Sequence, residues 1–204
     1  NPMKRLILRA VAASTLIVAT AVPAILAQNT AMAGSATNAP EFALTVFPLT
    51  SDEIGFSNSW GNARSGGRSH TGTDIMGPRG TPVVAATDGI VTKLGKHRLS
   101  GYFIRLDHGD GWATTYMHLN NDTIGTDDGK GGPWTAFFAT LMEGDEVKAG
   151  QIIGYVGDSG NAEGTRPHTH FEVKYDGRKK NPYTYLRDAF EREERCNMPV
   201  GKPL

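Results

Sequence analysis

The sequence contains one cysteine, Cys196, among its 204 residues. A single thiol cannot form an internal disulfide, so a fold held together by disulfides is excluded. The chain also lacks an excess of charge of either sign, because 21 Lys and Arg residues balance 21 Asp and Glu residues. This balance argues against nucleic acid as a partner, since bulk electrostatic attraction to phosphates requires a basic protein.

Long apolar runs are scarce, and the clearest one lies near the N-terminus. Residues 11–27 carry no charge, three basic residues precede them, and small residues follow. This order is typical of a secretory signal peptide, so we expect residues 1–33 to be a leader that is cleaved before Gly34. A retained membrane anchor is the alternative, but the run is shorter than the ~20 residues of a spanning helix and Pro23 interrupts it.

Glycine is abundant, and the 25 glycines separate short runs of β-branched and aromatic residues. This pattern predicts a mainly β protein rich in turns. The runs that we expect to form strands are 44–50, 81–86, 90–95, 102–108, 112–119, 146–157 and 168–177. Residues 181–194 change period and predict a short amphipathic helix, with Asn181 as its cap and with Tyr183, Leu186 and Phe190 on one face.

The chain divides into a leader, one domain and a tail. Residues 34–45 begin with a polar stretch that predicts a flexible lead, residues 46–190 hold the strand pattern, and residues 191–204 form a C-terminal tail.

The connection at residues 120–143 is unusually long for two neighbouring strands. Its first half is rich in Asp and Gly but lacks the spacing of a calcium loop, and its second half is apolar. Two interpretations remain open. Trp134, Phe137 and Phe138 line a substrate cleft while the polar half moves as a lid, or the apolar half covers an open sheet edge.

The stretch "RPHTHFEV" places two histidines one residue apart. In a strand, His168, His170 and Glu172 share one face, and Phe171 and Val173 face the core. Two adjacent imidazoles suit a metal site or a proton-transfer site, and an exposed pair of strand histidines is the alternative.

Two further motifs carry possible ligands. "SHTGTDI" contains His70 and Asp74, and the intervening Gly72 permits a tight backbone path between them; a hydrogen-bonded surface pair is the alternative. "TYMHL" places His118 at the end of a strand, where alternation predicts that it shares a face with Tyr116; a half-exposed sheet histidine is the alternative.

The motifs gain weight in combination. A catalytic zinc site takes three protein ligands and leaves one position open for water. His70, Asp74 and one histidine of the HxH pair match this requirement, and two histidines then remain for proton transfer. The chain has no HExxH motif, which excludes the common zinc proteases with a glutamate base.

The order of these motifs resembles the lysostaphin/LytM-type zinc endopeptidases, which cut peptide cross-links in bacterial peptidoglycan. The resemblance covers residues 55–187 and is carried by "GGRSHTGTDI", "YMHL" and "VKAGQIIGYVGDSGNAEGTRPHTHFEV". It implies the duplicated hybrid motif fold, an antiparallel β-sandwich or barrel-sandwich hybrid. It implies that residues 46–190 form a zinc metallopeptidase domain, and that residues 120–143 are an insertion absent from the simplest members.

The resemblance also implies roles for particular residues. It assigns zinc to His70, Asp74 and His170. It assigns the general base to His168, with His118 assisting, and Glu172 is a candidate to support a ligand.

The expected protein is a secreted, monomeric zinc endopeptidase of the cell envelope (periplasm or cell wall). Its expected partners are peptidoglycan peptide stems and cross-links, with no nucleic acid and no membrane span after leader removal. One alternative is a non-catalytic member of the same fold that binds the wall or activates a separate hydrolase. A biotinyl or lipoyl carrier is a weaker alternative, because a carrier has no use for four placed histidines.

Overall fold

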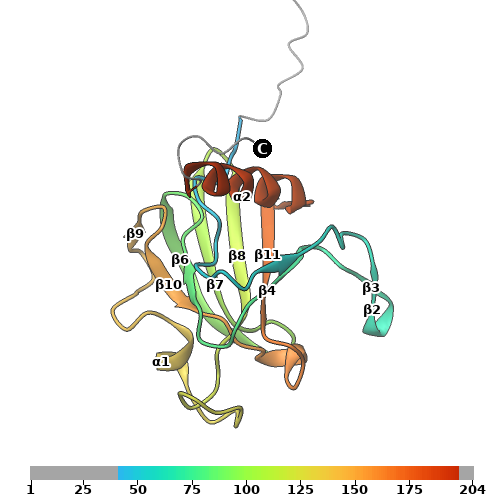
Figure 1. The fold of residues 1–204 in the computed structure, drawn as a ribbon, viewed down its shortest axis with the longest axis vertical. Coiled ribbons are helices and arrows are strands. Elements are labelled where there is room, and N and C mark those ends of the chain that lie inside the picture. Colours follow the sequence, from blue (N-terminus) through green and yellow to red (C-terminus); the bar gives the residue numbers. More distant parts are fainter. Residues whose placement is uncertain (1–40, 198–204) are drawn as a thin grey trace, which may run out of the picture. The chain divides into compact units, whose positions relative to one another are not determined.

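The computed structural model describes residues 41–197. The expected leader, most of the lead and the end of the tail therefore lie outside the described residues. The strands of the main sheet are β1 (Gly55–Phe56), β4 (Thr73–Met76), β6 (Gly89–His97), β7 (Gly101–Gly109), β8 (Trp112–Leu119), β9 (Glu146–Val147), β11 (His168–Tyr175) and β12 (Arg178–Lys180). Their order is β1-β4-β11-β8-β7-β6-β9, and β12 pairs with β11 (Figure 1).

Two smaller antiparallel pairs complete the strands. β5 (Pro82–Val84) pairs with β10 (Ile152–Tyr155), and β2 (Ala63–Arg64) forms a hairpin with β3 (Arg68–Ser69). Isolated bridges join the β5–β10 pair to its neighbours. One of them pairs Leu119, at the end of β8 in the main sheet, with Val156, which follows β10. All named strand pairs are antiparallel, so the predicted mainly β, antiparallel fold is confirmed.

The central strands follow the predicted alternation of faces. On β11, Phe171 and Val173 are fully buried in the core, as are Ile104 and Leu106 on β7. Burial of each such side chain contributes about 1.5–3 kcal/mol, so the core fixes which face of the sheet remains for the site.

The expected strand at residues 44–50 does not form. Leu49 makes one isolated bridge to Val83, and the backbone N–H groups of Thr45 and Val46 both donate to the Ala86 carbonyl. Pro48 has no N–H, which prevents a regular ladder through this segment. The segment still covers the core, because Leu44, Phe47 and Leu49 are almost completely buried. Hydrophobicity therefore predicted its burial but not its backbone conformation.

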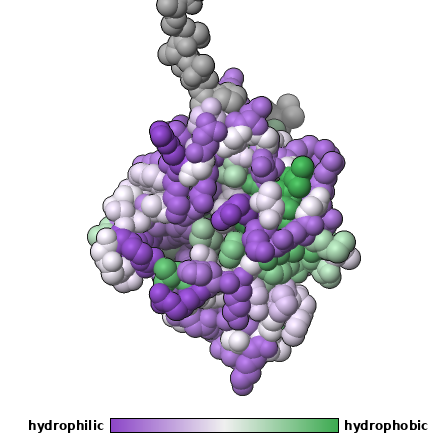
Figure 2. Space-filling view, turned by 180° about the vertical axis from the view of Figure 1, so that it is seen from behind, coloured by the Kyte–Doolittle hydropathy of each residue, from purple (hydrophilic) through white to green (hydrophobic). Residues whose placement is uncertain are grey.

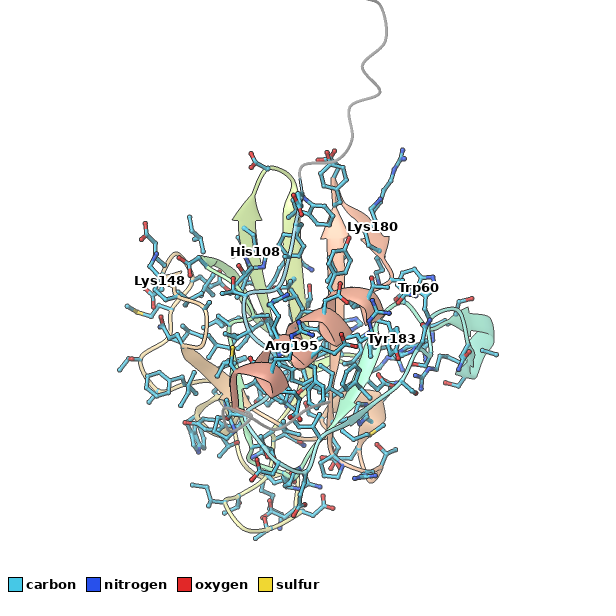
Figure 3. The ribbon with its side chains drawn as sticks, turned by 45° about the horizontal axis from the view of Figure 1, so that its top comes forward. Trp60, His108, Lys148, Lys180, Tyr183 and Arg195 are labelled. Atoms are coloured by element: carbon cyan, nitrogen blue, oxygen red, sulfur yellow. The ribbon has the colours of Figure 1, made fainter. Side chains whose placement is uncertain are left out.

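The predicted C-terminal helix is confirmed as α2 (Tyr183–Asn197). The Asn181 side chain accepts a hydrogen bond from the Tyr183 N–H at 3.1 Å, and Leu186 is fully buried. The helix lies across the sheet in Figure 1, and Figure 3 shows Tyr183 and Arg195 along it. It continues into the region assigned to the tail. Among residues 41–197, no helix has both the length and the apolar character needed to cross a membrane.

The 120–143 segment covers the edge of β10. It contains a single helical turn, α1 (Pro133–Ala136), beside β10 and β7. Phe137 bridges to Gly154, the Phe138 N–H donates to the Ile153 carbonyl at 3.0 Å, and the Phe137 ring packs edge-on against Tyr102. The segment therefore supplies the hydrogen bonds that the edge of the smaller sheet would otherwise lack.

The same segment carries most of the exposed large hydrophobic side chains of the described residues. The exposed large hydrophobic side chains are Ile90, Ile124, Trp134, Phe138 and Met142, and four of these five belong to the segment. Elsewhere hydrophilic side chains predominate, as Figure 2 shows for the face turned away from the viewer in Figure 1.

Arg79 ties the start of the segment to the loop that precedes β11. Its guanidinium donates to both oxygens of Asp158, at 2.7 and 3.1 Å, and also to Asp122. Both carboxylates are fully buried. The hydrogen bond to Asp158 raises the pKa of Arg79. One cation thus compensates two charges that would be costly to bury alone.

We predict that Arg79→Met lowers the free energy of unfolding by about 3–5 kcal/mol, because it leaves two buried carboxylates without a cation. Denaturant unfolding measures this loss. The control is Lys93→Met, which breaks the exposed Lys93–Glu143 pair (side chains 52% and 45% exposed) and should cost less than about 1 kcal/mol. Equal losses in the two variants would contradict the prediction.

Candidate metal centre and cleft

A cleft of about 730 Å³ opens on the polar face of the sheet. Its floor comes from β4, β8 and β11, and its walls come from Lys179 of β12 and from three segments: residues 64–71, 97–100 and 161–166. No residue of the 120–143 segment lines it, although the structure describes that whole segment. The interpretation that Trp134, Phe137 and Phe138 line the cleft is therefore wrong, and the sheet-edge interpretation agrees with the structure.

Three predicted ligands meet at the floor of the cleft. Strands β4 and β11 pair so that Asp74 lies opposite His170, and His70 lies four residues before Asp74. His70 Nε2 lies 2.9 Å from His170 Nδ1 and 3.1 Å from Asp74 Oδ1, which is 2.9 Å from His170 Nδ1. Tetrahedral coordination at the usual Zn–N and Zn–O lengths needs ligand atoms about 3.3 Å apart. The three atoms nearly match this spacing.

Partners outside the cluster determine which ring nitrogens carry protons. His70 Nδ1 lies 3.0 Å from the Ser59 carbonyl, which can only accept, so this nitrogen is the donor. His170 Nε2 faces the buried Glu172 carboxylate at 3.5 Å, which favours the proton on that nitrogen. Each neutral ring then directs a lone pair inward, toward Asp74 Oδ1. Three acceptors that converge in this way suit a cation between them.

The charges around the cluster favour the ionised carboxylates. Burial tends to raise the pKa of Asp74, but its interactions with His170 and His70 hold it well below its usual range. Burial also opposes the ionised form of Glu172, but His170 and Lys179 lower its pKa to about 2. Burial tends to lower the pKa of His170, yet Asp74 and Glu172 raise it. Arg64 donates to the second oxygen of Asp74 at 2.5 Å.

A second pair of histidines lies beside the three converging residues. The rings of His118 and His168 are 5.1 Å apart between centroids, and His118 is 6.0 Å from His170. His118 Nδ1 donates to the Ser159 carbonyl and His168 Nδ1 donates to the Arg166 carbonyl, both at 2.8 Å. Both Nε2 atoms are therefore free to accept a proton.

Alternation predicted that His118 shares a face with Tyr116, and this prediction is wrong. The φ of 60° at His118 is left-handed, which turns its side chain into the cleft while Tyr116 and Leu119 remain in the core. Such a conformation costs of order 1–3 kcal/mol and persists where neighbours enforce it. Here the His118 N–H donates to the Ser100 carbonyl at 2.9 Å. Burial lowers the pKa of His118 to about 4.

All five predicted site residues therefore line one cleft. Of the other two histidines, His97 lies at the rim, and His108 lies away from the cleft on the β7–β8 pair, bonded to Asp88 and Thr114 (Figure 3). Sequence reasoning missed Ser59 and Arg64, because nothing in their local sequence distinguishes them from ordinary loop residues.

Gly72 is required for space and not for an unusual backbone angle. A Cβ atom at this position would collide with His170 Nε2 and would lie 2.6 Å from the Phe171 carbonyl oxygen. Its φ does not lie in the left-handed region. The sequence suggested that Gly72 permits a special backbone path. The structure shows instead that glycine is needed because His170 and Phe171 pack closely against it.

Comparisons with known proteins identify the family of the chain. The model of Peptidase family M23 matches residues 68–131 and 133–182, which is more than half of the chain. Peptidoglycan DD-endopeptidase ShyC of Vibrio cholerae is 34% identical over 57% of this chain and 23% of its own length. Murein hydrolase activator NlpD of Salmonella dublin is 37% identical over 56% of this chain and 26% of its own length. The matches thus span about a quarter of the length of each of these two relatives.

Two solved structures share the fold. A zinc-containing peptidase from Vibrio cholerae superposes with a TM-score of 0.51 at 29% identity, over 69% of this chain and 39% of that one. The catalytic domain of lysostaphin from Staphylococcus simulans superposes with a TM-score of 0.53 at 29% identity, over 66% of this chain and 92% of that one.

We predict that Gly72→Ala weakens Zn²⁺ binding by about 10- to 100-fold, because the added methyl group displaces the His170 ring. Isothermal titration with Zn²⁺ measures the affinity, and Tm measured alongside monitors the fold. Gly55→Ala on β1 is the matched control, since its Cβ meets only Met76 Cβ at 3.9 Å. If folded Gly72→Ala protein bound Zn²⁺ as tightly as the control, the packing argument would be wrong.

Proposed function

The chain belongs to peptidase family M23, as its resemblance to lysostaphin predicted, and on this basis we propose that it is a zinc-dependent endopeptidase of peptidoglycan cross-links. The observation that carries the proposal is the convergence of three acceptor atoms beside two histidines with free Nε2 atoms. The similarity to a peptidoglycan DD-endopeptidase supports the substrate, although the match covers 23% of that relative.

We assign the metal to His70, Asp74 and His170, the three residues whose acceptor atoms converge. Two nitrogens and one carboxylate oxygen suit zinc, and a structurally similar protein is a zinc-containing peptidase. When bound, zinc supplies Lewis acidity and brings the pKa of a water molecule toward about 7. Glu172 orients the His170 ring, and Arg64 holds the Asp74 carboxylate, so the ligands are oriented before the metal binds.

The remaining histidines handle protons. His168 Nε2 accepts the proton of the attacking water and later delivers it to the leaving amine. His118 Nε2 accepts a hydrogen bond and so orients that water. A neutral His118 cannot donate to a developing oxyanion, because its one N–H is committed to the Ser159 carbonyl. Orientation of the water, and not stabilisation of the oxyanion, is therefore the assisting role that fits this tautomer.

A non-catalytic role as a hydrolase activator is the second candidate, and the similarity to murein hydrolase activator NlpD favours it. The five site residues at one cleft favour catalysis, since an activator needs neither metal ligands nor a proton acceptor. Mass spectrometry of purified peptidoglycan after incubation with zinc-loaded protein distinguishes them. New peptide ends in the absence of any other hydrolase support the enzyme, and intact cross-links support the activator.

The proposed place of action is the cell envelope. The substrate lies outside the cytoplasmic membrane, and the relatives carry names that refer to peptidoglycan and murein. The expected leader at residues 1–33 supports the same location by an independent argument.

Two substitutions separate metal binding from proton transfer. We expect His170→Ala to lose most of its zinc, and His168→Ala to keep zinc but lose about 10²- to 10⁴-fold in kcat. Metal analysis and turnover of a cross-linked peptide measure the two effects, with His108→Ala as the control that keeps both. Full zinc occupancy in His170→Ala, or normal turnover in metal-replete His168→Ala, would refute the respective role.

The 120–143 segment should affect stability and not substrate choice. We expect replacement of residues 123–142 by a short Gly/Ser turn to lower Tm, because it exposes the edge of β10. Relative kcat/KM values among cross-linked peptides should stay the same, since no residue of the segment lines the cleft. Trp134→Ala, which removes a side chain that is 72% exposed, is the control that should change neither quantity. A changed preference among peptides would contradict this prediction.

A further inference from the structure

The walls of the cleft carry an imbalance of charge. Four cationic side chains line it, namely Arg64, Arg68, Arg166 and Lys179. The carboxylates that line it, within the described part of the chain, are Asp74 and Glu172. A metal ion at the three converging residues adds further positive charge, so the cleft as a whole is suited to an anionic group.

Three of the four cations already have partners within the protein. Arg64 donates to Asp74, and Lys179 donates to Glu172 and, at 2.7 Å, to Thr71. Arg68 donates through Nε to the Ser65 carbonyl at 3.0 Å and through Nη2 to the Ser65 hydroxyl at 3.2 Å. These contacts orient the three side chains toward groups of the protein itself.

Arg166 differs from the other three. Its side chain is exposed, lines the cleft, and makes no hydrogen bond or ion pair with any of residues 41–197. Its backbone is held in place, because its carbonyl accepts the Nδ1 proton of His168 at 2.8 Å. The preceding loop is fixed as well, since the Gly164 N–H donates to the buried Asp158. A free guanidinium on a fixed backbone is prepared to bind a ligand.

We infer that Arg166 binds a carboxylate of the substrate, and that the cleft thereby selects peptides with a free carboxylate near the scissile bond. This inference rests on the proposed endopeptidase function. A guanidinium can donate two parallel hydrogen bonds to a carboxylate, which an amide cannot accept in the same way. Because Arg166 and His168 line the same cleft, the carboxylate is expected near the cleaved bond, on the side of His168.

The test compares two cross-linked peptides that differ only in this carboxylate, one as the free acid and the other as the amide. The wild-type protein should have a KM about tenfold lower for the acid, with similar kcat. Arg166→Gln should lose this preference by raising KM for the acid alone, and Arg166→Lys should keep part of it. Arg178→Gln on β12 is the matched control, because Arg178 is also exposed and without a partner among the described residues but does not line the cleft.

A binding measurement separates this inference from the proposed function. In the His168→Ala background, calorimetry should show about tenfold tighter binding of the acid than of the amide, and the added Arg166→Gln change should abolish the difference. Equal affinities, or a preference that survives Arg166→Gln, would overturn the inference even if the wild-type protein cleaves both peptides. If binding depends on Arg166 but the wild-type protein cleaves neither peptide, the inference is supported and the enzymatic proposal is refuted.

Discussion

The pairing of β4 with β11 is the constraint on which the site depends. It places Asp74 opposite His170, although 96 residues separate them in the chain. A shift of one residue in this register would turn His170 into the core and Phe171 into the cleft. The burial of Phe171 and Ile75 on the opposite face therefore enforces the position of the three converging acceptor atoms.

Hydrogen bonds around the three converging residues complete what the register begins. Ser59 and Glu172 each face the outer nitrogen of a histidine, and so direct the lone pairs of His70 and His170 toward Asp74. Without a cation, three acceptors about 3 Å apart repel one another. The protein thus keeps an unfavourable local arrangement through contacts outside it, which is typical of a preorganised metal site.

The other wall of the cleft depends on Arg79. By neutralising Asp122 and Asp158, it holds the loop that supplies the Ser159 carbonyl to His118 and the Arg166 carbonyl to His168. The 120–143 segment does not line the cleft and supports this loop through the ion pair between Asp122 and Arg79. Its apolar half covers the edge of β10, whereas the charged side chains of the cleft walls come from residues 64–71, residues 161–166 and Lys179.

The sequence by itself determined the mainly β class, the C-terminal helix, the alternation along β11 and the motifs whose residues meet in the cleft. These features depend on local periodicity and on residue type, and both can be read without knowing which distant segments lie nearby. Only the tertiary structure decided the left-handed His118, the irregular path of residues 44–50, the location of residues 120–143 and the free state of Arg166. The first three depend on partners distant in the sequence, such as Ser100, Ala86 and Ile153, and the last on the lack of an ion pair to Arg166 among the described residues. A local pattern cannot specify such partners, because it indicates which face a residue occupies but not which element lies opposite.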